Sequence, residues 1–272
     1  MTDNPNNVFV LMLERMKARA DMNKQMGIIP SNGPSIEYDC PICQDREIVP
    51  IEKDGIVNDV VICECKARKA QKRLFRASGI TDEQANFEIK DYKVTPENAK
   101  MLQAMKLYMD AEAWKKGEGF MLSGSVGVGK SMMSQIVANY LLKSGQAVIF
   151  VSTNSLMAEL RVAQFTNGGI EFEQKIEMLI NADVVIFDDI GKEKATEWVQ
   201  TQYFRIIDGR YNKRKATGFT SNYSFDELAD RFSEFGEAIV SRIVAMTRGY
   251  SVSIKARDFR LMLGRKDIEE RA

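Results

Sequence analysis

Short runs of apolar, often β-branched residues recur between longer segments of helical periodicity from residue 97 onward. Five of these runs predict strands, at 119–123, 147–152, 183–188, 217–221 and 250–254. Apolar strands that alternate with helices are typical of a mainly parallel sheet whose two faces are covered by helices. The pattern therefore predicts an α/β domain over residues 97–272.

A different pattern precedes this domain. Over residues 8–26, apolar side chains such as Phe9, Met12 and Met16 recur on one helical face, and Gly27 follows directly. This spacing predicts an amphipathic helix that ends at the glycine. Such a helix either packs on its own domain or presents an adaptable, Met-rich face to a protein partner. Its place outside the α/β domain favours the partner.

All four cysteines fall in two close pairs upstream of the α/β domain. Cys40 and Cys43 form a C-x-x-C motif, and Cys63 and Cys65 form a C-x-C motif. An Asp-Gly turn at 54–55 lies between apolar runs, so we expect a β-hairpin to bring the pairs together. Four thiolates at this spacing suit a tetrahedral zinc site, in preference to core cysteines or a redox pair. We therefore expect a small zinc-binding helix and hairpin domain that the metal stabilises.

Composition excludes some chemistry without indicating a partner. Lys and Arg total 38, as do Asp and Glu, so the net charge predicts no global attraction to nucleic acid. The chain has no histidine, which excludes Ser-His-Asp and Cys-His catalysis and every histidine-containing metal site. No apolar run approaches the ~20 residues that span a bilayer, and the N-terminus lacks a secretory signal pattern. We expect a cytoplasmic protein.

Three segments follow from these patterns. Residues 1–76 hold the N-terminal helix and the cysteine module, residues 77–96 form a linker, and residues 97–272 form the α/β domain. The basic run at 66–76 is usually a solvated face, with nucleic-acid contact as the alternative. Phe87 and Tyr92 are expected to anchor the linker on the domain that follows.

A phosphate-binding loop joins the first predicted strand of the α/β domain to a helix. Its glycines let successive backbone N–H groups turn toward a triphosphate, and the helix N-terminus adds its dipole. Lys130 would place a cation on the outer phosphates, and Ser131 would offer a hydroxyl to Mg²⁺. A chance glycine-rich turn would lack the flanking strand and helix. The motif G-x-x-x-x-G-K-S comprises Gly124, Ser125, Val126, Gly127, Val128, Gly129, Lys130 and Ser131.

Polar residues end two further predicted strands. Asp188 and Asp189 follow the apolar run that begins at residue 184, which places both acids at the sheet edge that carries the phosphate loop. We expect Asp188 to hold Mg²⁺ and Asp189 to orient or deprotonate the attacking water. Asn222 can hydrogen-bond that water, although a Ser-Asn pair also simply makes turns. Together these residues predict a slow, partner-stimulated hydrolysis of ATP to ADP and phosphate.

Two arginines near the end of the domain are candidates for phosphate contacts. Arg242 lies on a predicted helix and could reach the γ-phosphate of a neighbouring protomer, and Arg248 could sense nucleotide. A lone arginine is more often a surface ion-pair partner.

From Phe120 onward the chain resembles the AAA+ domain of the DnaC/DnaI-type replicative helicase loaders of bacteria and phages. The helix at 8–26 with the four-cysteine module is similar to the DnaI type in particular. The resemblance covers nearly the whole chain and implies an AAA+ P-loop NTPase with a five-stranded, mostly parallel sheet. The matching motifs are 124–131, Phe-Asp-Asp-Ile-Gly-Lys-Glu at 187–193, Arg-Tyr at 210–211, Thr-Ser-Asn at 220–222 and Ser-Arg-Ile at 241–243.

The resemblance implies a role in replication initiation. Residues 1–76 would bind a hexameric DnaB-type helicase, and the AAA+ domain would bind ATP and help place the helicase on single-stranded DNA. Arg242 would act as a finger between protomers that assemble side by side. The family's DNA contact falls here on Arg161, Gln164 and Phe165, which offer a charge for phosphate and an aromatic ring for base stacking.

Other functions fit part of the pattern. A transposition-regulator ATPase of the IstB type shares the AAA+ domain but leaves the zinc module unexplained. A non-hydrolysing adaptor would use ATP only to order a binding surface, and the intact acids argue against it. A small-molecule kinase would need an acceptor-binding lid that the sequence does not show. From the short segment after Ile254 we expect no extra domain of the kind that replication initiators have.

Overall fold

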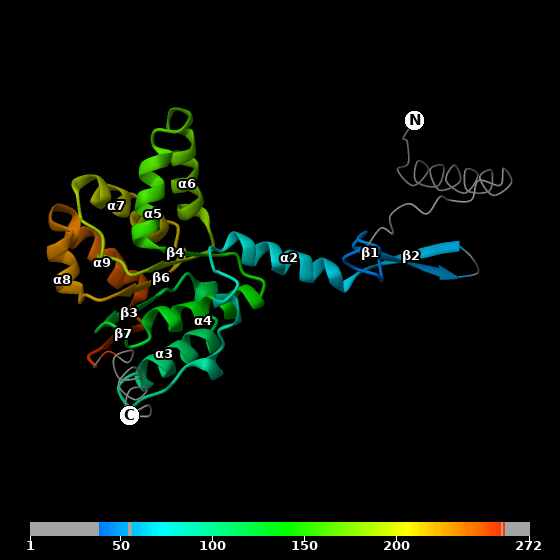
Figure 1. Ribbon diagram of the computed structural model, residues 1–272, viewed down its shortest axis with the longest axis horizontal. Helices are drawn as coiled ribbons and strands as arrows, with labels where there is room; N and C mark the ends of the chain where they lie inside the picture. The colour runs from blue at the N-terminus through cyan, green and yellow to red at the C-terminus, as the bar shows by residue number, and fades with distance from the viewer. Residues whose placement is uncertain (1–37, 54–55, 257, 259–272) are drawn as a thin grey trace, which may run out of the picture. The chain divides into compact units, whose positions relative to one another are not determined.

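The computed structural model describes residues 38–53, 56–256 and 258, so the amphipathic segment 8–26 lies outside the described residues. The chain divides into two units, Met1–Lys66 and Ala67–Ala272. The described part of the first unit carries the cysteines, and the second carries the α/β domain (Figure 1).

A two-stranded antiparallel hairpin forms the centre of the first unit. β1 (Ile48–Lys53) pairs with β2 (Ile56–Ile62), with Ile48 opposite Ile62. The Cys63 amide donates to the Glu47 carbonyl at 2.9 Å, which extends the pairing beyond the strands. The hairpin predicted from the Asp-Gly turn is thus confirmed. α2 (Glu64–Ala77) begins directly after β2.

Strands and helices alternate through the second unit, as the sequence pattern predicts. The strands are β3 (Phe120–Gly124), β4 (Val148–Ser152), β5 (Val184–Asp188), β6 (Ala216–Ser221) and β7 (Ser251–Ile254). The helices are α3 (Ala99–Asp110), α4 (Lys130–Lys143), α5 (Thr153–Ala163), α6 (Ile170–Asn181), α7 (Glu197–Asn212), α8 (Phe225–Arg231) and α9 (Gly236–Thr247). Short 3₁₀ turns are Gln84–Asn86, Ile89–Asp91, Ala113–Lys116, Asn167–Gly169 and Ser233–Phe235.

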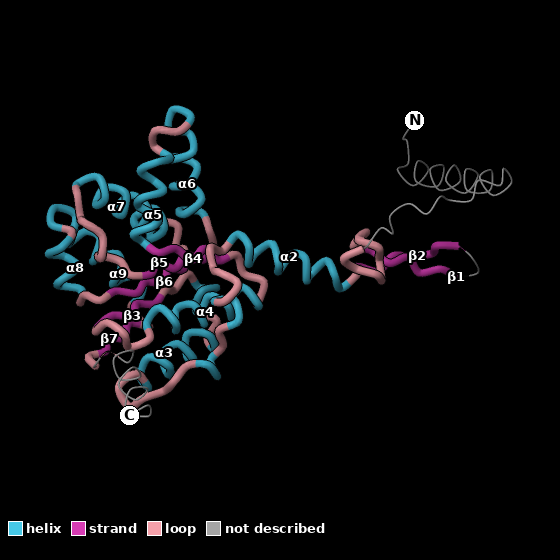
Figure 2. Tube along the Cα trace, in the orientation of Figure 1, coloured by secondary structure: helices cyan, strands magenta, loops and turns pink. Residues whose placement is uncertain are grey.

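All neighbouring strands of the five-stranded sheet run parallel, in the order β4-β5-β6-β3-β7 (Figure 2). β3 therefore lies between β6 and β7, and β5 lies next to β6. Since parallel strands end at a common edge, the loops after β3, β5 and β6 meet there. This topology confirms the predicted AAA+ fold class and brings the sequence motifs together.

Side chains that alternate along each strand enter two separate cores. On β5, Val184 and Ile186 pack with α3 and α4, whereas Val185 and Phe187 pack with the layer of α5 to α9. Phe187 stacks on Phe219 of β6, with ring centroids 5.6 Å apart. Because successive residues of a strand face opposite sides, a sheet covered on both faces needs continuous apolar runs. The two helical layers are visible in Figure 1.

Capping residues fix where two helices of the larger layer begin. The Thr196 hydroxyl accepts the Val199 amide at the start of α7. Ser224 and Glu227 form a reciprocal capping box at the start of α8. Each cap satisfies backbone donors that have no partner within the helix.

Arg210 on α7 is fully buried and ties the helix to the sheet. Its guanidinium donates to the carbonyls of Leu179, Ala182 and Ala216 and to the Thr217 hydroxyl. Burial lowers the pKa of Arg210 to about 9, so the group stays charged at neutral pH. The arginine of the Arg-Tyr motif at 210–211 therefore has a structural role in this chain.

The predicted linker packs against the α/β domain. The Asn139 amide on α4 donates to the carbonyls of Gln84 and Phe87, at 2.7 and 3.0 Å. Phe87 and Tyr92 both join the core beneath α3 and α4, which confirms them as anchors. The residues before α3 thus contact the helix that follows the phosphate loop.

No helix among the described residues is long and apolar enough to cross a membrane.

Candidate functional site

The loop between β3 and α4 needs glycine at specific positions. Gly124, Gly127 and Gly129 all have positive φ, at 120°, 77° and 90°. A Cβ at Gly124 would lie 1.9 Å from the Ile254 carbonyl oxygen, because β7 passes directly beside it. At Gly129 a Cβ would meet the Tyr92 ring at 3.0 Å. Backbone conformation and close packing together require the glycines of the motif.

Lys130 lies at the centre of a hydrogen-bond network. Its side-chain ammonium donates to the carbonyls of Gly124 and Ser125, at 2.9 and 2.7 Å, and to Asn222 Oδ1 at 2.8 Å. Lys130 is 5% exposed, and buried charges in proteins are kept only where they are paired or hydrogen-bonded. The structure thus brings Lys130 and Asn222, two residues singled out from the sequence, into direct contact.

The two acids after β5 are held by residues at the end of β6. The Thr220 hydroxyl donates to Asp188 Oδ1 at 2.6 Å and accepts the Asp189 amide at 2.8 Å. Asn222 Nδ2 donates to Asp189 Oδ1 at 3.1 Å. Burial raises the pKa of Asp188, while hydrogen bonds from Thr220 and Ser131 oppose that rise. The acids, the lysine and the asparagine therefore form one connected network.

Asp189 has an unusual backbone conformation. Its φ of 66° lies in the left-handed region, which aspartate tolerates better than most residues. Lys192 pairs with the second carboxylate oxygen of Asp189 at 3.1 Å, and the Asp189 side chain is 26% exposed. The carboxylate is thus oriented from two sides while it remains accessible to solvent.

Two residues make contacts at this site that the sequence did not assign to them. Thr220, which belongs to the Thr-Ser-Asn motif, lies two residues before Asn222, so the period of two along a strand could have indicated its place in the network. Tyr92, whose hydroxyl donates to the Val128 carbonyl at 3.3 Å, comes from the linker. No local sequence signal marks a contact between residues so far apart in the chain.

The donors of this network suit a nucleotide with Mg²⁺. The loop amides, the helix N-terminus and the lysine ammonium favour phosphate. Ser131 and Asp188 lie in contact and offer hydroxyl and carboxylate oxygens, which are the ligands that Mg²⁺ prefers.

Arg242 and Arg248 have separate surroundings. Arg242 Nε on α9 donates to Asp208 Oδ1 of α7 at 2.5 Å, and its guanidinium lies 4.7 Å from the Phe204 ring centre. Arg248 follows α9, is exposed, and makes no hydrogen bond or ion pair with another residue in the described part of the chain. The structure therefore joins neither arginine to the lysine and acid network of its own chain.

The four cysteine thiols converge in the first unit. Their sulfurs all lie within 4.8 Å of one another, with 3.8 Å between Cys40 and Cys63 and 3.2 Å between Cys43 and Cys65. A tetrahedron with Zn–S bonds of about 2.3 Å has S–S edges of about 3.8 Å. All four thiols are buried and none is in a disulfide.

The thiols also change one another's pKa values. A hydrogen bond from the Cys43 amide lowers the pKa of Cys40 to about 7. The thiols around Cys65, that of Cys43 first, raise the pKa of Cys65. Because four thiolates this close repel one another, the cluster suits a cation.

A groove of about 520 Å³ runs beside α5. Arg161 lines it from α5, Phe165 lines it from the turn after α5, and Lys194 and Thr196 line it from the segment after β5. Phe165 is 81% exposed, and the Arg161 guanidinium lies 5.2 Å from the Trp198 ring centre. The predicted DNA-contact residues Arg161 and Phe165 are thus brought together, and Gln164 is exposed at the end of the same helix.

Comparison with known proteins assigns this arrangement to a family. The family described as IstB-like ATP binding protein matches residues 55–266, which is most of the chain. The chain belongs to this family. Its shared domain covers the P-loop, the acids and the whole five-stranded sheet.

Relatives of this family member include helicase loaders. The chain is 27% identical over 219 residues to the replicative helicase loader DnaC of Buchnera aphidicola subsp. Schizaphis graminum (strain Sg), which covers 79% of this chain and 85% of the relative. A crystal structure of the DnaC helicase loader matches with a TM-score of 0.57 at 25% identity, covering 64% of this chain and 100% of that one. A DnaI structure matches with a TM-score of 0.55 at 24% identity, covering 66% and 94%, and shows the fold alone. The resemblance to DnaC/DnaI-type loaders is thereby confirmed.

Proposed function

We propose that the protein is an ATP-hydrolysing loader that places a hexameric DnaB-type replicative helicase on single-stranded DNA in the cytoplasm. The observation that carries the ATPase part is the single network of Lys130, Asp188, Asp189 and Asn222. Similarity to DnaC supports the helicase part. The finer assignments below are parts of this proposal.

Each residue of the network has a distinct task toward ATP. Residues 124–131 cradle the phosphates, and Lys130 exchanges its carbonyl and Asn222 contacts for phosphate oxygens. Ser131 and Asp188 would hold Mg²⁺, which would neutralise charge on the phosphates. Asp189 accepts a proton from the attacking water, and Asn222 and Lys192 orient its carboxylate.

Arg242 completes the site only in an assembly. In the single chain Asp208 holds the Arg242 guanidinium. Arg242 can therefore reach the γ-phosphate of a neighbouring protomer only when its contact with Asp208 breaks. Arg248, exposed after α9, serves as a second phosphate contact. Self-association through the AAA+ domain follows from the role of Arg242.

The groove beside α5 is the proposed site for single-stranded DNA. Phe165 offers a ring on which a base can stack, and Arg161 and Lys194 supply positive charge. Gln164 adds an amide at the same end of the helix. A groove with two cations and an exposed aromatic ring suits a flexible strand better than a rigid duplex.

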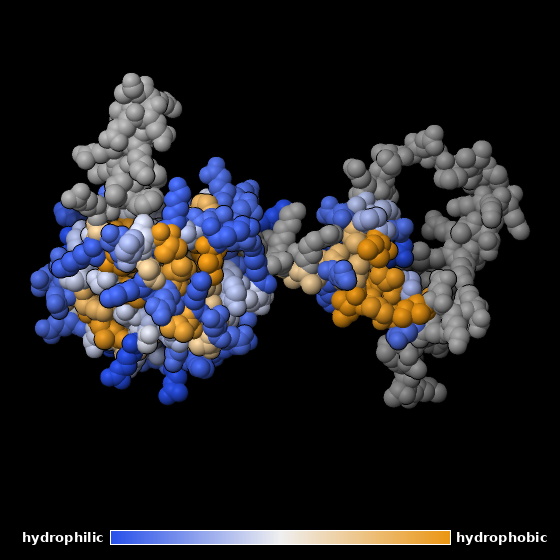
Figure 3. Space-filling model, turned by 90° about the horizontal axis from the view of Figure 1, so that it is seen from below, coloured by the Kyte–Doolittle hydropathy of each residue, from blue (hydrophilic) through white to orange (hydrophobic). Residues whose placement is uncertain are grey.

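The first unit is the proposed docking site for the helicase. Zinc held by Cys40, Cys43, Cys63 and Cys65 stabilises it. Figure 3 shows apolar surface on its hairpin. The exposed aliphatic side chains of that hairpin are Ile48, Ile51, Val57, Val60, Val61 and Ile62. Apolar surface of this kind on so small a unit is typical of a protein-binding face.

Complex formation tests this assignment. We expect the full-length protein to co-migrate with a hexameric DnaB-type helicase from the same source in size exclusion with light scattering. Cys40→Ser should lose zinc and the complex while its ATP affinity stays within about twofold, because the nucleotide network lies in the other unit.

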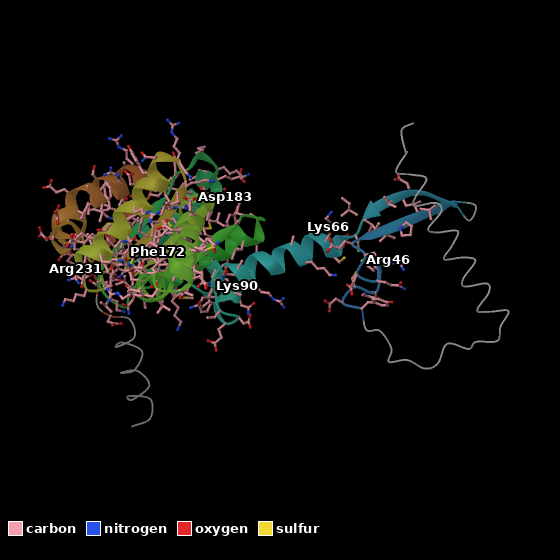
Figure 4. The ribbon with its side chains drawn as sticks, turned by 90° about the horizontal axis from the view of Figure 1, so that it is seen from above. Arg46, Lys66, Lys90, Phe172, Asp183 and Arg231 are labelled. Carbon is pink, nitrogen blue, oxygen red and sulfur yellow. The ribbon has the colours of Figure 1, made fainter. Side chains whose placement is uncertain are left out.

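Arg46→Ala is the matched control in the first unit, since this side chain, labelled in Figure 4, is exposed and donates to the exposed side chain of Gln44. It should retain zinc. A Cys40→Ser protein that lacks metal and still binds the helicase would refute the role of the zinc module in docking, and a wild-type protein that purifies without metal would refute the zinc assignment. A wild-type protein that never binds the helicase, with or without ATP, would favour the transposition-regulator alternative.

A further inference from the structure

The helix α2 holds a concentration of positive charge. Six of its residues are Lys or Arg, and its single acid is Glu64. The whole chain has 38 basic and 38 acidic residues, so removing six and one leaves 32 and 37, and the chain outside α2 has a net charge of −5. A local concentration of this kind attracts polyanions although the whole chain is neutral. The basic positions are 66, 68, 69, 72, 73 and 76.

Helix geometry gathers these six positions on one side of α2. At 3.6 residues per turn they fall within an arc of about 160°, and at 1.5 Å per residue they extend over about 15 Å. The positions of Ala67, Ala70 and Ala77 lie outside this arc. The side chains of Lys66, labelled in Figure 4, and of Arg76 are exposed, as are the three alanines. The basic side is therefore open to a partner at both of its ends.

The charges along α2 repel one another within the helix. Six pairs of basic positions are three or four residues apart, which is the spacing at which helical side chains are neighbours. One pair at this spacing, 64 and 68, joins opposite charges. Like charges at this spacing destabilise a helix, and the exposed alanines bury little surface that would offset the repulsion. A bound polyanion would remove this repulsion.

The end of α2 is fixed to the sheet. Ser78, directly after the helix, is fully buried, and its carbonyl accepts the Phe150 amide of β4 at 2.6 Å. Gly79 has a φ of 79°, and a Cβ there would lie 2.5 Å from the Phe150 carbonyl oxygen. β4 is an edge strand that continues into α5, which lines the proposed DNA groove. The part of α2 from Ala67 onward thus belongs to the same unit as that groove.

We propose that the basic side of α2 binds the phosphate backbone of nucleic acid, as a contact separate from the α5 groove. Cations repeated at every helical turn suit a linear array of phosphates. The alanines offer too little apolar area for insertion into a membrane surface. Phosphate contacts carry no sequence information, so this contact adds affinity without choosing bases. It requires neither the loader function nor bound nucleotide, because no residue of the ATP network takes part.

Salt dependence measures this contact directly. The full-length protein is titrated by anisotropy against a fluorescein-labelled oligo-dT and a labelled duplex of equal length, without helicase or nucleotide, over a range of salt concentrations. The test variant combines Lys72→Gln, Arg73→Gln and Arg76→Gln, since glutamine has a similar helix propensity. Each lost phosphate contact makes the plot of log affinity against log salt less steep by about 0.7 for a single strand and about 0.9 for a duplex. For oligo-dT we expect a slope that is less steep by about two, and an affinity at about 50 mM salt that is at least about tenfold lower.

Two further variants separate charge from structure. Exchanging Lys for Arg and Arg for Lys at the same three positions preserves the charge and should keep the wild-type slope, with an affinity within about twofold. Lys100→Gln, Lys106→Gln and Lys116→Gln together remove three exposed charges from α3 and the turn after it, and should leave both values unchanged. Melting temperature and zinc content report whether each variant folds.

Each outcome supports or overturns the contact. A reduced slope with oligo-dT, with the duplex or with both supports it and shows which form α2 holds. Glutamine at 72, 73 and 76 with wild-type affinity and slope for both nucleic acids overturns it, as does an equal loss in the charge-preserving variant. Intact nucleic-acid binding with loss of the helicase also overturns it, because α2 would then bind an acidic protein surface. Helicase loading is measured separately, so failure of the loader proposal is distinguishable from failure of this one.

Discussion

Replacing Lys130 by alanine is expected to weaken ATP binding by about a hundredfold or more, as is usual when one partner of a buried charged contact is truncated. The ammonium lies at the centre of the P-loop, where it donates hydrogen bonds to three protein oxygens. Those oxygens show that the side chain is directed into the loop rather than to solvent. Loss of the cation removes the only lysine charge that the motif places on the phosphates. Titration with a fluorescent ATP analogue gives the dissociation constant directly.

Lys143→Ala provides the matched control for this substitution. Lys143 ends the helix that Lys130 begins, and it pairs with Glu88 at 2.6 Å. Its removal should leave nucleotide affinity within about twofold, since exposed ion pairs contribute little. Melting temperatures show whether the Lys130→Ala domain stays folded. Unchanged nucleotide affinity in a folded Lys130→Ala protein would refute the assignment of the loop.

Asp189→Asn is expected to lower the rate of ATP turnover by at least about a hundredfold while nucleotide affinity is retained. Asparagine preserves the shape, tolerates the left-handed backbone, and can still accept the bond from Asn222. It cannot accept a proton from water. Steady-state release of phosphate, with nucleotide binding measured in parallel, separates a catalytic loss from a binding loss.

The control for this change lies at the opposite end of β5. Asp183 precedes the strand, is labelled in Figure 4, and pairs with Lys215 at 2.9 Å. Asp183→Asn removes the same charge far from the carboxyl edge and should leave turnover close to that of the wild type. Equal rates for Asp189→Asn and wild type would show that another group accepts the proton.

The central part of the site could be predicted from the sequence because its signals are local. A phosphate loop is contiguous, and the acids directly follow an apolar strand, so their shared edge follows from parallel strand geometry alone. In the structure Lys130 contacts Asn222 and Asn222 contacts Asp189, so these residues lie together at that edge. The positions of the strands could also be predicted from the sequence, since strands buried in a parallel sheet are continuous apolar runs.

Other contacts depend on tertiary packing and could not be predicted. Thr153 meets Glu193 across 40 residues, and Tyr92 meets Val128 across 36. The partner of Arg242 depends on how α7 and α9 pack, which periodicity does not specify. The domain boundaries at residues 76 and 96, the role of Arg242 and the zinc ion stay predictions.

The most direct test of the loader proposal uses circular single-stranded DNA, which a closed hexameric helicase ring cannot encircle without opening. The measurement is the amount of helicase retained on the circle after the free proteins are removed, with and without this protein and ATP. The account predicts that the full-length protein raises helicase retention severalfold with ATP and that Lys130→Ala does not. Retention that the protein leaves unchanged, although it binds both ATP and the helicase, would contradict the loader function.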